Sequence, residues 1–229
     1  MIYIEIYIEE LVATFVLLSW IIFVVKILTR KLYDFMVKRN LEHNVAVYYN
    51  RKIIHILAGG LCAMVVPIYF KSFILPLTMS LLLAVFLFIS HRTNGQLMYW
   101  FQTEDNMYEV SFCIMWGLII TLGWVLSDGD LRVGVLPILF MSIGDAVTGI
   151  VRNTLYKKRT KSWWGNLAMA IVSVIIGAAM GLAGILAGVT ASLIEHFEFR
   201  PIDDNVLISL TSLSILLMAK IFAPWSLAI

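Results

Sequence analysis

The stretch from Ser142 to Asn166 places one acidic residue and several basic residues at the end of an apolar run. Asp145 lies near the C-terminal end of the run that begins at about Leu131, and the adjacent Gly144 leaves room for a ligand to approach the backbone. Ionisable side chains at membrane depth are functional-site hypotheses by default, and Mg²⁺ prefers one or two carboxylates together with substrate phosphates. We therefore predict that Asp145 binds a metal ion at a phosphate-handling site; the alternative is that it caps its helix or pairs with Arg152. The basic residues that follow are Arg152, Lys157, Lys158, Arg159 and Lys161.

Lys161 and Ser162 directly precede a predicted helix that begins at about Gly165. Free backbone N–H groups and the helix dipole make such a start an anion-binding site. We expect Lys161 to neutralise phosphate charge there, helped by Lys157 or Arg152. The alternative is that the lysines of this loop are a solvated topology signal that touches anionic lipid.

A second acidic group follows the next apolar stretch. It comprises Glu195, Asp203, Asp204 and Asn205. If the group faces the basic loop, it can complete a metal site or bind sugar hydroxyls, with Asp203 and Asp204 as metal ligands. If the stretch Gly165–Leu193 crosses the membrane once, the group lies on the other side and is a solvated loop.

Three further side chains of interest open an earlier apolar run. Arg51, Lys52 and His55 can share one helix face, since residues three and four positions apart are neighbours on a helix. They could hold phosphate, and His55 could accept a proton from an alcohol; alternatively they are a basic flank with an interfacial histidine. Three weaker candidates, which are either close to the metal or solvated, are Glu104, Asp105 and Glu109.

The composition indicates a membrane protein. The chain of 229 residues is 61% hydrophobic and 14% charged, whereas soluble domains carry about 25% charged residues. Arg30–Lys52 holds six and Arg152–Lys161 holds five of the seventeen lysines and arginines, a clustering that places both segments in the cytoplasm. Because topology already explains these charges, nucleic acid is a poor candidate partner. Cys62 and Cys113 lie in apolar runs and are expected to be buried thiols.

The runs predict an all-α polytopic protein that forms a single membrane domain over residues 1–229, with seven or eight transmembrane helices. Glu5 precedes the first run and Glu9 and Glu10 lie at its start, whereas Arg30 and Lys31 follow it, so the N-terminus is expected outside. Arg30–Asn50 is expected to form a cytoplasmic surface helix or loop. The predicted spans are Tyr7–Leu28, Ile53–Phe70, Ser72–Ser90, Tyr108–Leu126, Leu131–Val151 and Asn205–Ala223, with one or two more in Gly165–Leu193.

The number of crossings in Gly165–Leu193 is open. As one helix, its 29 residues would be about 44 Å long, against about 30 Å for a hydrocarbon core. It is therefore either one strongly tilted helix or two short spans that break within Gly177–Gly184. The glycines there also have the small-xxx-small spacing of closely packed helices. Only a break would return Glu195 to the side of the basic loop.

Three motifs in order resemble the membrane-bound polyprenol kinases, the CTP-dependent dolichol and phytol kinases. The resemblance covers most of the chain from residue 51 to about 210, and each motif alone is weak. The motifs are Arg51-Lys52-x-x-His55, then Gly144-Asp145-Ala146 followed by Lys161-Ser162-x-x-Gly165, and finally Glu195 with Ile202-Asp203-Asp204-Asn205.

The resemblance implies a lipid kinase that transfers the γ-phosphate of CTP, or of another nucleoside triphosphate, to a long-chain isoprenoid alcohol. Mg²⁺ would be the cofactor, and the site would lie at the cytoplasmic face of an integral membrane protein, in the plasma membrane of a prokaryote or the endoplasmic reticulum of a eukaryote. Because the last two motifs of the family act on that side, we favour the break. Trp164 stands where the family usually has Glu, and Asn166 stands where it usually has Ser or Thr. The resemblance therefore does not decide which nucleoside triphosphate is the phosphate donor.

The sequence does not decide whether His55 or Glu195 is the general base. Two other functions also remain. One is a CTP-dependent lipid cytidylyltransferase, although the acid-rich C-terminal signature of the phosphatidate enzymes is absent from the sequence. The other is a transporter of a phosphorylated solute, because glycine-broken spans are found in transporters.

Overall fold

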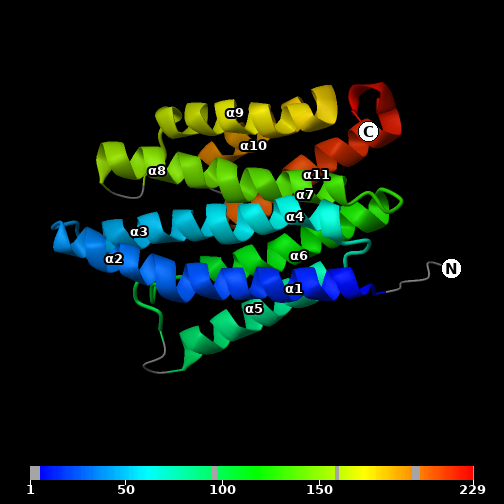
Figure 1. Cartoon of the computed structure of the whole chain (residues 1–229). Helices are drawn as coiled ribbons and strands as arrows, with labels where there is room; N and C mark the ends of the chain where they lie inside the picture. The colour runs from blue at the N-terminus through cyan, green and yellow to red at the C-terminus, as the bar shows by residue number, and fades with distance from the viewer. Residues whose placement is uncertain (1–5, 94–96, 158–159, 198–201, 229) are drawn as a thin grey trace.

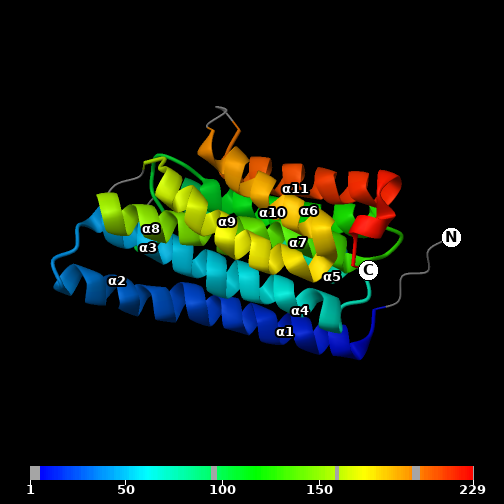
Figure 2. The same ribbon diagram turned by 90° about the horizontal axis from the view of Figure 1, so that it is seen from above.

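The computed structural model describes residues 6–93, 97–157, 160–197 and 202–228, and these ranges are helical with short connections and one isolated bridge. Seven helices in this part of the chain are long and apolar enough to cross a membrane. The prediction of an all-α polytopic membrane protein is therefore confirmed. The helices lie side by side in one elongated bundle, as Figure 1 shows and as Figure 2 shows from above.

The helices have the following bounds. In the first half they are α1 (Ile8–Ile22), η1 (Phe23–Leu28), α2 (Thr29–Lys38), α3 (His43–Ile54), η2 (His55–Gly60), α4 (Leu61–Tyr69), α5 (Ile74–Arg92) and α6 (Tyr108–Leu126). In the second half they are α7 (Leu131–Leu139), η3 (Phe140–Gly144), α8 (Asp145–Tyr156), α9 (Trp163–Gly177), η4 (Ala178–Met180), α10 (Gly181–His196), α11 (Asp204–Phe222) and η5 (Pro224–Ser226).

The first span is longer than predicted. Ile8–Lys38 is one helical run of 31 residues, about 46 Å long, so it extends beyond a hydrocarbon core of about 30 Å. The run contains no glycine or proline, and it ends just before Asn40, which has a left-handed φ of 62°. Asparagine tolerates this conformation better than most residues. In the expected surface segment Arg30–Asn50, the helix α2 continues directly from the first span and α3 leads directly into the second, with a short connection at residues 39–42.

Two other spans contain a π-helical segment where they meet. α3, η2 and α4 form the continuous run His43–Tyr69, and α7, η3 and α8 form Leu131–Tyr156. A Cβ atom on Gly59 would come within 2.9 Å of the Ser142 hydroxyl oxygen, and one on Gly60 within 2.8 Å of the Ile143 side chain. The two glycines therefore allow η2 and η3 to pack closely, and π-helical turns are frequent at functional sites.

The stretch Gly165–Leu193 is a helical hairpin, so the favoured break within Gly177–Gly184 is confirmed and a single tilted helix is excluded. α9 and α10 are separated by the short η4, after which Gly181 has a φ of 73°. A Cβ on Gly177 would lie 2.3 Å from the Gly184 carbonyl oxygen, so the arms touch through their glycines. In Figure 1, α10 runs behind α9. The hairpin returns the chain to the end of the bundle where α9 begins.

The end of the bundle that carries the predicted site is formed by α2, α3, α8 and the first turn of α9. In Figure 1 this end is on the left, whereas the start of α1 and the end of α11 lie on the right.

Candidate functional site

Lys52 and Asp145 form the central ion pair of the site. Lys52 Nζ lies 2.6 Å from Asp145 Oδ2, and His55 Nδ1 lies 3.7 Å from the same oxygen. Lys52 is near the end of α3, His55 is the first residue of η2, and Asp145 begins α8 directly after η3. The close contact of η2 and η3 thus positions the acid against the basic face that the spacing of Arg51, Lys52 and His55 predicted.

The pair depends on a glycine one turn after the acid. A Cβ atom on Gly149 would lie 2.2 Å from Lys52 Cε and 3.0 Å from the Tyr48 hydroxyl oxygen. Lys52 therefore crosses the bare backbone of α8 to reach Asp145. The sequence analysis missed Gly149, although its position four residues after Asp145 places it on the same helix face.

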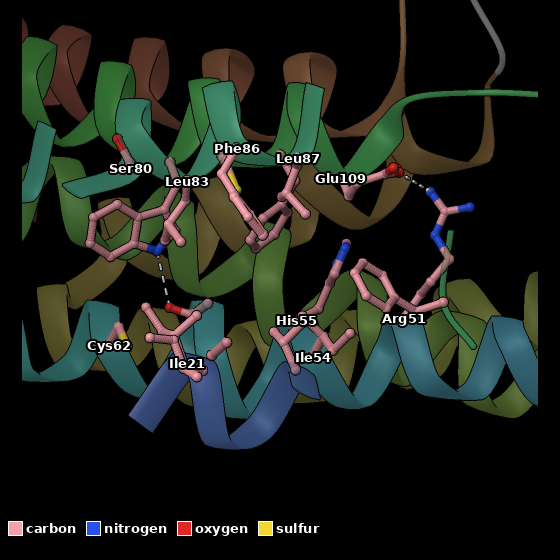
Figure 3. A pocket seen from close by; sticks show the side chains of 18 of the residues that line it. Ile21, Arg51, Ile54, His55, Cys62, Ser80, Leu83, Phe86, Leu87 and Glu109 are labelled. Atoms are coloured by element: carbon pink, nitrogen blue, oxygen red, sulfur yellow. Dashed lines mark hydrogen bonds and ion pairs between the residues drawn. The ribbon is translucent and has the colours of Figure 1, made fainter. Parts of the chain in front are cut away.

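His55 stands between two pockets. Its ring stacks on Phe112 of α6, with the ring centroids 4.1 Å apart. It lines a polar cavity with Lys52 and Asp145, and it also lines a second pocket of apolar side chains, into which Figure 3 shows it pointing. No described residue forms a hydrogen bond with its Nδ1.

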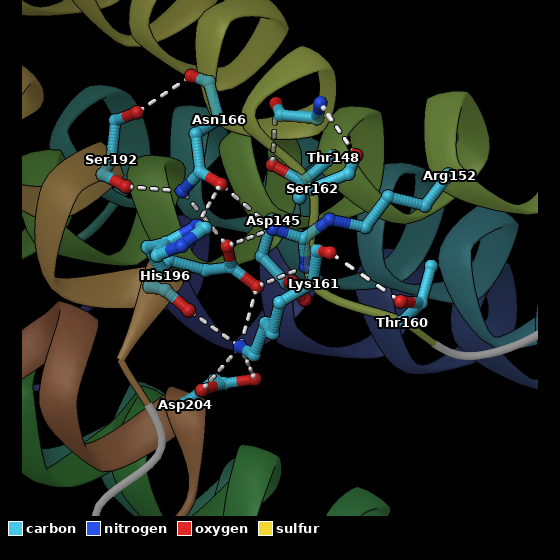
Figure 4. Close-up of polar contacts among 12 residues, drawn as sticks. Asp145, Thr148, Arg152, Thr160, Lys161, Ser162, Asn166, Ser192, His196 and Asp204 are labelled. Atoms are coloured by element: carbon cyan, nitrogen blue, oxygen red, sulfur yellow. Dashed lines mark hydrogen bonds and ion pairs between the residues drawn. The ribbon is translucent and has the colours of Figure 1, made fainter.

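Arg152 and Glu195 form a second, deeply buried pair. Nη1 and Nη2 of Arg152 each donate to one oxygen of Glu195 at 2.7 Å. Asn166 joins the pair, because it accepts from Arg152 at 2.9 Å and donates to Glu195 Oε2 at 3.1 Å (Figure 4). Glu195 is only 1% exposed. The predicted alternative pairing of Asp145 with Arg152 is wrong, because the hairpin brings Glu195 to this arginine instead.

Lys161 connects this buried pair to α11. Its Nζ donates to Glu195 Oε1 at 2.8 Å and to both oxygens of Asp204 at 3.1 and 3.2 Å. It also contacts the backbone oxygen of Glu195 at 2.5 Å. The acidic group after the hairpin therefore faces the basic loop, as the break required (Figure 4).

Asp203 and Asn205 bind α11 to α6. Asp203 caps α11 by accepting from the Val206 backbone N–H at 3.1 Å, and its other carboxylate oxygen accepts from the Ser111 hydroxyl. Asn205 donates to the Tyr108 carbonyl oxygen and to the Ser111 hydroxyl, both at 3.1 Å. These contacts give both residues a structural role, and both also line the polar cavity.

The polar cavity has a volume of about 920 Å³ and lies between α3, α8, α10 and α11. Ligand pockets span roughly 300–1,000 Å³, so it has the size of a small-molecule site. Within the described ranges, no group of three or more His, Cys, Asp or Glu side chains is arranged to hold a metal ion. The charged residues that line the cavity are Arg51, Lys52, Asp105, Asp145, Arg152, Lys161, Glu195, Asp203 and Asp204.

Some predicted ligands lie outside the cavity lining. Lys157 is exposed at the end of α8, with a left-handed φ of 52°. The Ser162 hydroxyl accepts from the Gly165 backbone N–H at 3.3 Å and so caps α9 itself. A Cβ on Gly165 would meet Arg152 Nε at 2.6 Å, so this glycine makes room for the buried arginine. Gly144 lies at the η3–α8 junction, packed against α9, while Lys158 and Arg159 fall outside the described residues.

The loop before α6 also contributes to the site. Glu109 is buried rather than solvated, because Gln102 donates to its Oε1 at 2.9 Å and Arg51 lies 3.6 Å from its Oε2. Glu104 and Asp105 are exposed, as expected of loop acids. Asn44 and Tyr48, which the sequence did not single out, also line the cavity; they lie two turns and one turn before Lys52, on the same helix face.

Comparisons with known proteins returned no relative. The chain matches no protein-family model, no curated protein and no solved structure.

Proposed function

We propose that the protein is a membrane lipid kinase that transfers the γ-phosphoryl group of CTP, or of another nucleoside triphosphate, to a long-chain isoprenoid alcohol. The observation that supports this most is the junction of two pockets at His55 and Arg51. A polar cavity with paired lysines and carboxylates lies on one side, and an apolar pocket among the spans lies on the other. An enzyme that joins a charged donor to an apolar acceptor needs such a junction.

The cations of the cavity suit a triphosphate. Lys52 and Lys161 are held by carboxylates in the structure, and both line the cavity. Phosphoryl transfer depends almost entirely on positioning and on neutralising charge at the phosphate oxygens. We expect Lys52 and Lys161 to bind these oxygens, while Arg152, which is only 3% exposed, holds Glu195 and the hairpin in place.

The donor set of the cavity fits Mg²⁺ bound together with phosphates. Asp145 and Asp204 line it, and Mg²⁺ requires only one or two carboxylates when substrate phosphates supply other ligands. Asp203 is a weaker candidate, because both of its oxygens already accept hydrogen bonds. When bound, the ion would neutralise charge that develops on the triphosphate.

His55 is the better candidate for the general base. The oxygens of Glu195 already accept from Arg152, Lys161 and Asn166. In the reaction, the acceptor oxygen forms a bond to the γ-phosphorus as the bond from that phosphorus to the β–γ bridging oxygen breaks. The hydroxyl proton passes to His55 Nδ1, and the products are a lipid monophosphate and a nucleoside diphosphate.

The basic end of the bundle is proposed to face the cytoplasm, where nucleoside triphosphates are found. The two basic segments of the sequence meet at this end, and positive charge is retained on the cytoplasmic side of membranes. Trp163 and Trp164 begin α9 there and are both exposed, as in an interfacial aromatic belt.

The test supplies the purified protein with geranylgeraniol or a longer polyprenol, Mg²⁺ and CTP labelled at either the γ- or the α-phosphate. We expect lipid label from γ-labelled CTP alone. Lipid label from α-labelled CTP would indicate a cytidylyltransferase, and flux of a phosphorylated solute into liposomes without conversion would indicate a transporter. ATP labelled at the γ-phosphate, run in parallel, identifies the donor base.

The matched variants are Asp145→Asn and Asp128→Asn. Asp128 is an exposed acid in the turn between α6 and α7, at the opposite end of the bundle. We expect Asp145→Asn to lose at least about a hundredfold in activity, the range for single groups that stabilise a transition state, and Asp128→Asn to keep it. Full activity in Asp145→Asn would refute the assignment.

A further inference from the structure

The apolar groove is a second pocket that lies between α1, the α3–α4 run, α5 and α6 (Figure 3). It extends from Arg51 to Cys62 along one run, about three helical turns or roughly 16 Å. Apart from its ends it is lined by aliphatic and aromatic side chains, such as Ile54, Leu83 and Phe112.

Two polar groups in the far part of the groove, those of Trp116 and Ser80, are already hydrogen-bonded within the protein. The Trp116 indole N–H donates to the Gly59 carbonyl oxygen at 3.0 Å, and the Ser80 hydroxyl donates to the Leu77 carbonyl oxygen at 2.9 Å. Both polar groups are therefore satisfied within the protein. A hydrocarbon chain could occupy this part without leaving a buried donor or acceptor unpaired.

The near end of the groove is different, because two buried polar atoms there lack hydrogen bonds. No described residue donates to Glu109 Oε2 or forms a hydrogen bond with His55 Nδ1, although each residue is only 8% exposed. Their charged neighbours are beyond hydrogen-bond distance, since Arg51 Nη2 lies 3.6 Å from Glu109 Oε2 and Asp145 Oδ2 lies 3.7 Å from His55 Nδ1. Buried polar atoms without a hydrogen bond are rare, and each calls for an explanation such as an unseen ligand. An alcohol O–H at this end would supply the missing donor.

The groove also borders the lipid phase. Ile22 of α1 and Phe86 of α5 line it on two sides and are 53% and 48% exposed. Figure 1 shows α5 diverging from the α1–α2 run toward the basic end of the bundle. A membrane lipid can therefore enter sideways between α1 and α5 without passing through water.

We infer that the apolar groove holds the hydrocarbon tail of a single-chain lipid alcohol and presents its hydroxyl to His55 and Glu109. The groove has a volume of about 110 Å³, less than a long isoprenoid chain occupies, so it has room for part of one tail, and the remainder of the chain extends between α1 and α5 into the lipid. This inference rests on the proposed function for the identity of the acceptor. It adds the tail site, its side entrance and the selection of single-chain alcohols.

The first experiment maps the tail directly. Geranylgeraniol with a diazirine near the middle of its chain is photolysed with the protein in nanodiscs, without nucleotide, and the labelled peptides are identified. We expect labelling at Met79 and Leu83 of α5 and competition by unlabelled geranylgeraniol but not by diacylglycerol. Labelling elsewhere on the lipid-facing surface, or equal competition by diacylglycerol, would overturn the inference.

A matched pair of variants provides the second measurement. Leu83→Trp fills the groove, whereas Leu82→Trp adds the same side chain at the neighbouring position, which is 62% exposed and does not line the groove. We expect Leu83→Trp to lower labelling and raise KM for geranylgeraniol about tenfold, and Leu82→Trp to change neither. Equal behaviour of the two variants would overturn the inference.

The outcomes separate the two proposals, because photolabelling requires no phosphoryl transfer. Competed labelling in the groove without a phosphorylated product would refute the kinase and retain the tail site. Phosphorylation of the alcohol with labelling outside the groove, and with no effect of Leu83→Trp, would retain the kinase and refute the tail site.

Discussion

Removing the charge of Asp145 tests the central ion pair most sharply. In Asp145→Asn, Lys52 keeps its charge but loses the carboxylate that lies 2.6 Å from its Nζ. Breaking a buried pair by removing one partner costs about 3–5 kcal/mol. Because each side chain is 10% exposed at the border of the polar cavity, we expect the lower end, a loss of about 3 kcal/mol in the free energy of unfolding.

A double-mutant cycle separates the pair from its surroundings. Lys52→Met leaves Asp145 with His55, at 3.7 Å, and the more distant Lys161 as basic neighbours, so it should also destabilise the protein. The double variant Lys52→Met/Asp145→Asn contains neither buried charge. We therefore expect it to be more stable than the two single losses predict, with a coupling of about 2 kcal/mol. It should remain inactive, since both proposed phosphate-site groups are gone.

The assay is denaturant unfolding in detergent micelles, followed by tryptophan fluorescence and circular dichroism. The control cycle uses Asp128 and Lys220, which form an ion pair at the opposite end of the bundle. Their charged atoms lie 2.8 Å apart, and the Asp128 side chain is 92% exposed. Exposed pairs contribute about 0–1 kcal/mol, so its coupling should fall in that range. If the Lys52–Asp145 cycle gave a coupling no larger than this control, the reasoning from burial would be refuted.

Three further predictions concern the backbone and the access of solvent to the site. Gly149→Ala should lower activity and cost about 1–3 kcal/mol, because a Cβ 2.2 Å from Lys52 Cε displaces the lysine; unchanged kinetics would contradict that packing. Gly181→Ala should cost about 1–3 kcal/mol in unfolding experiments, because its φ of 73° and ψ of -156° form a conformation that is essentially restricted to glycine; a stable variant would argue against the hairpin turn. Thr160→Cys should react with a membrane-impermeant maleimide from the cytoplasmic side only, and added CTP with Mg²⁺ should protect it; labelling from outside would invert the topology.

The helices were predictable because a bilayer imposes length and polarity on every segment that crosses it. Tyr108–Leu126 was predicted with the bounds of α6, since charged or turn-forming residues stand at both of its ends. The helix that contains the first span extends ten residues beyond the predicted end at Leu28. Polar residues mark where a chain leaves the membrane, but they do not mark where its helix ends. The bend at Gly181 could be anticipated only as an alternative, since glycine spacing serves packing and turning equally.

The site was predictable only to the level of helix faces. Spacing placed Arg51, Lys52 and His55 together, but it could not choose Asp145 as their partner or pair Arg152 with Glu195. Those pairings depend on how α3, α8 and the hairpin pack, which no local pattern encodes. The burial of Glu109 was missed for the same reason: its partner Gln102 lies in a loop whose path is set by tertiary contacts.

The hairpin has a consequence for how the protein is assembled in the membrane. From Trp163 to Ile194 it contains no Asp, Glu, Lys or Arg, and its tip is covered by the last residues of the chain, where the Ala228 backbone N–H donates to the Met180 carbonyl oxygen at 3.3 Å. Carrying a charged side chain to the bilayer centre costs about 2.5–3.5 kcal/mol on insertion scales. Both arms can therefore enter the lipid together as a loop without translocating any charge. With the basic end facing the cytoplasm, as proposed, Glu195 would stay on the side where it was synthesised and pair there with Arg152.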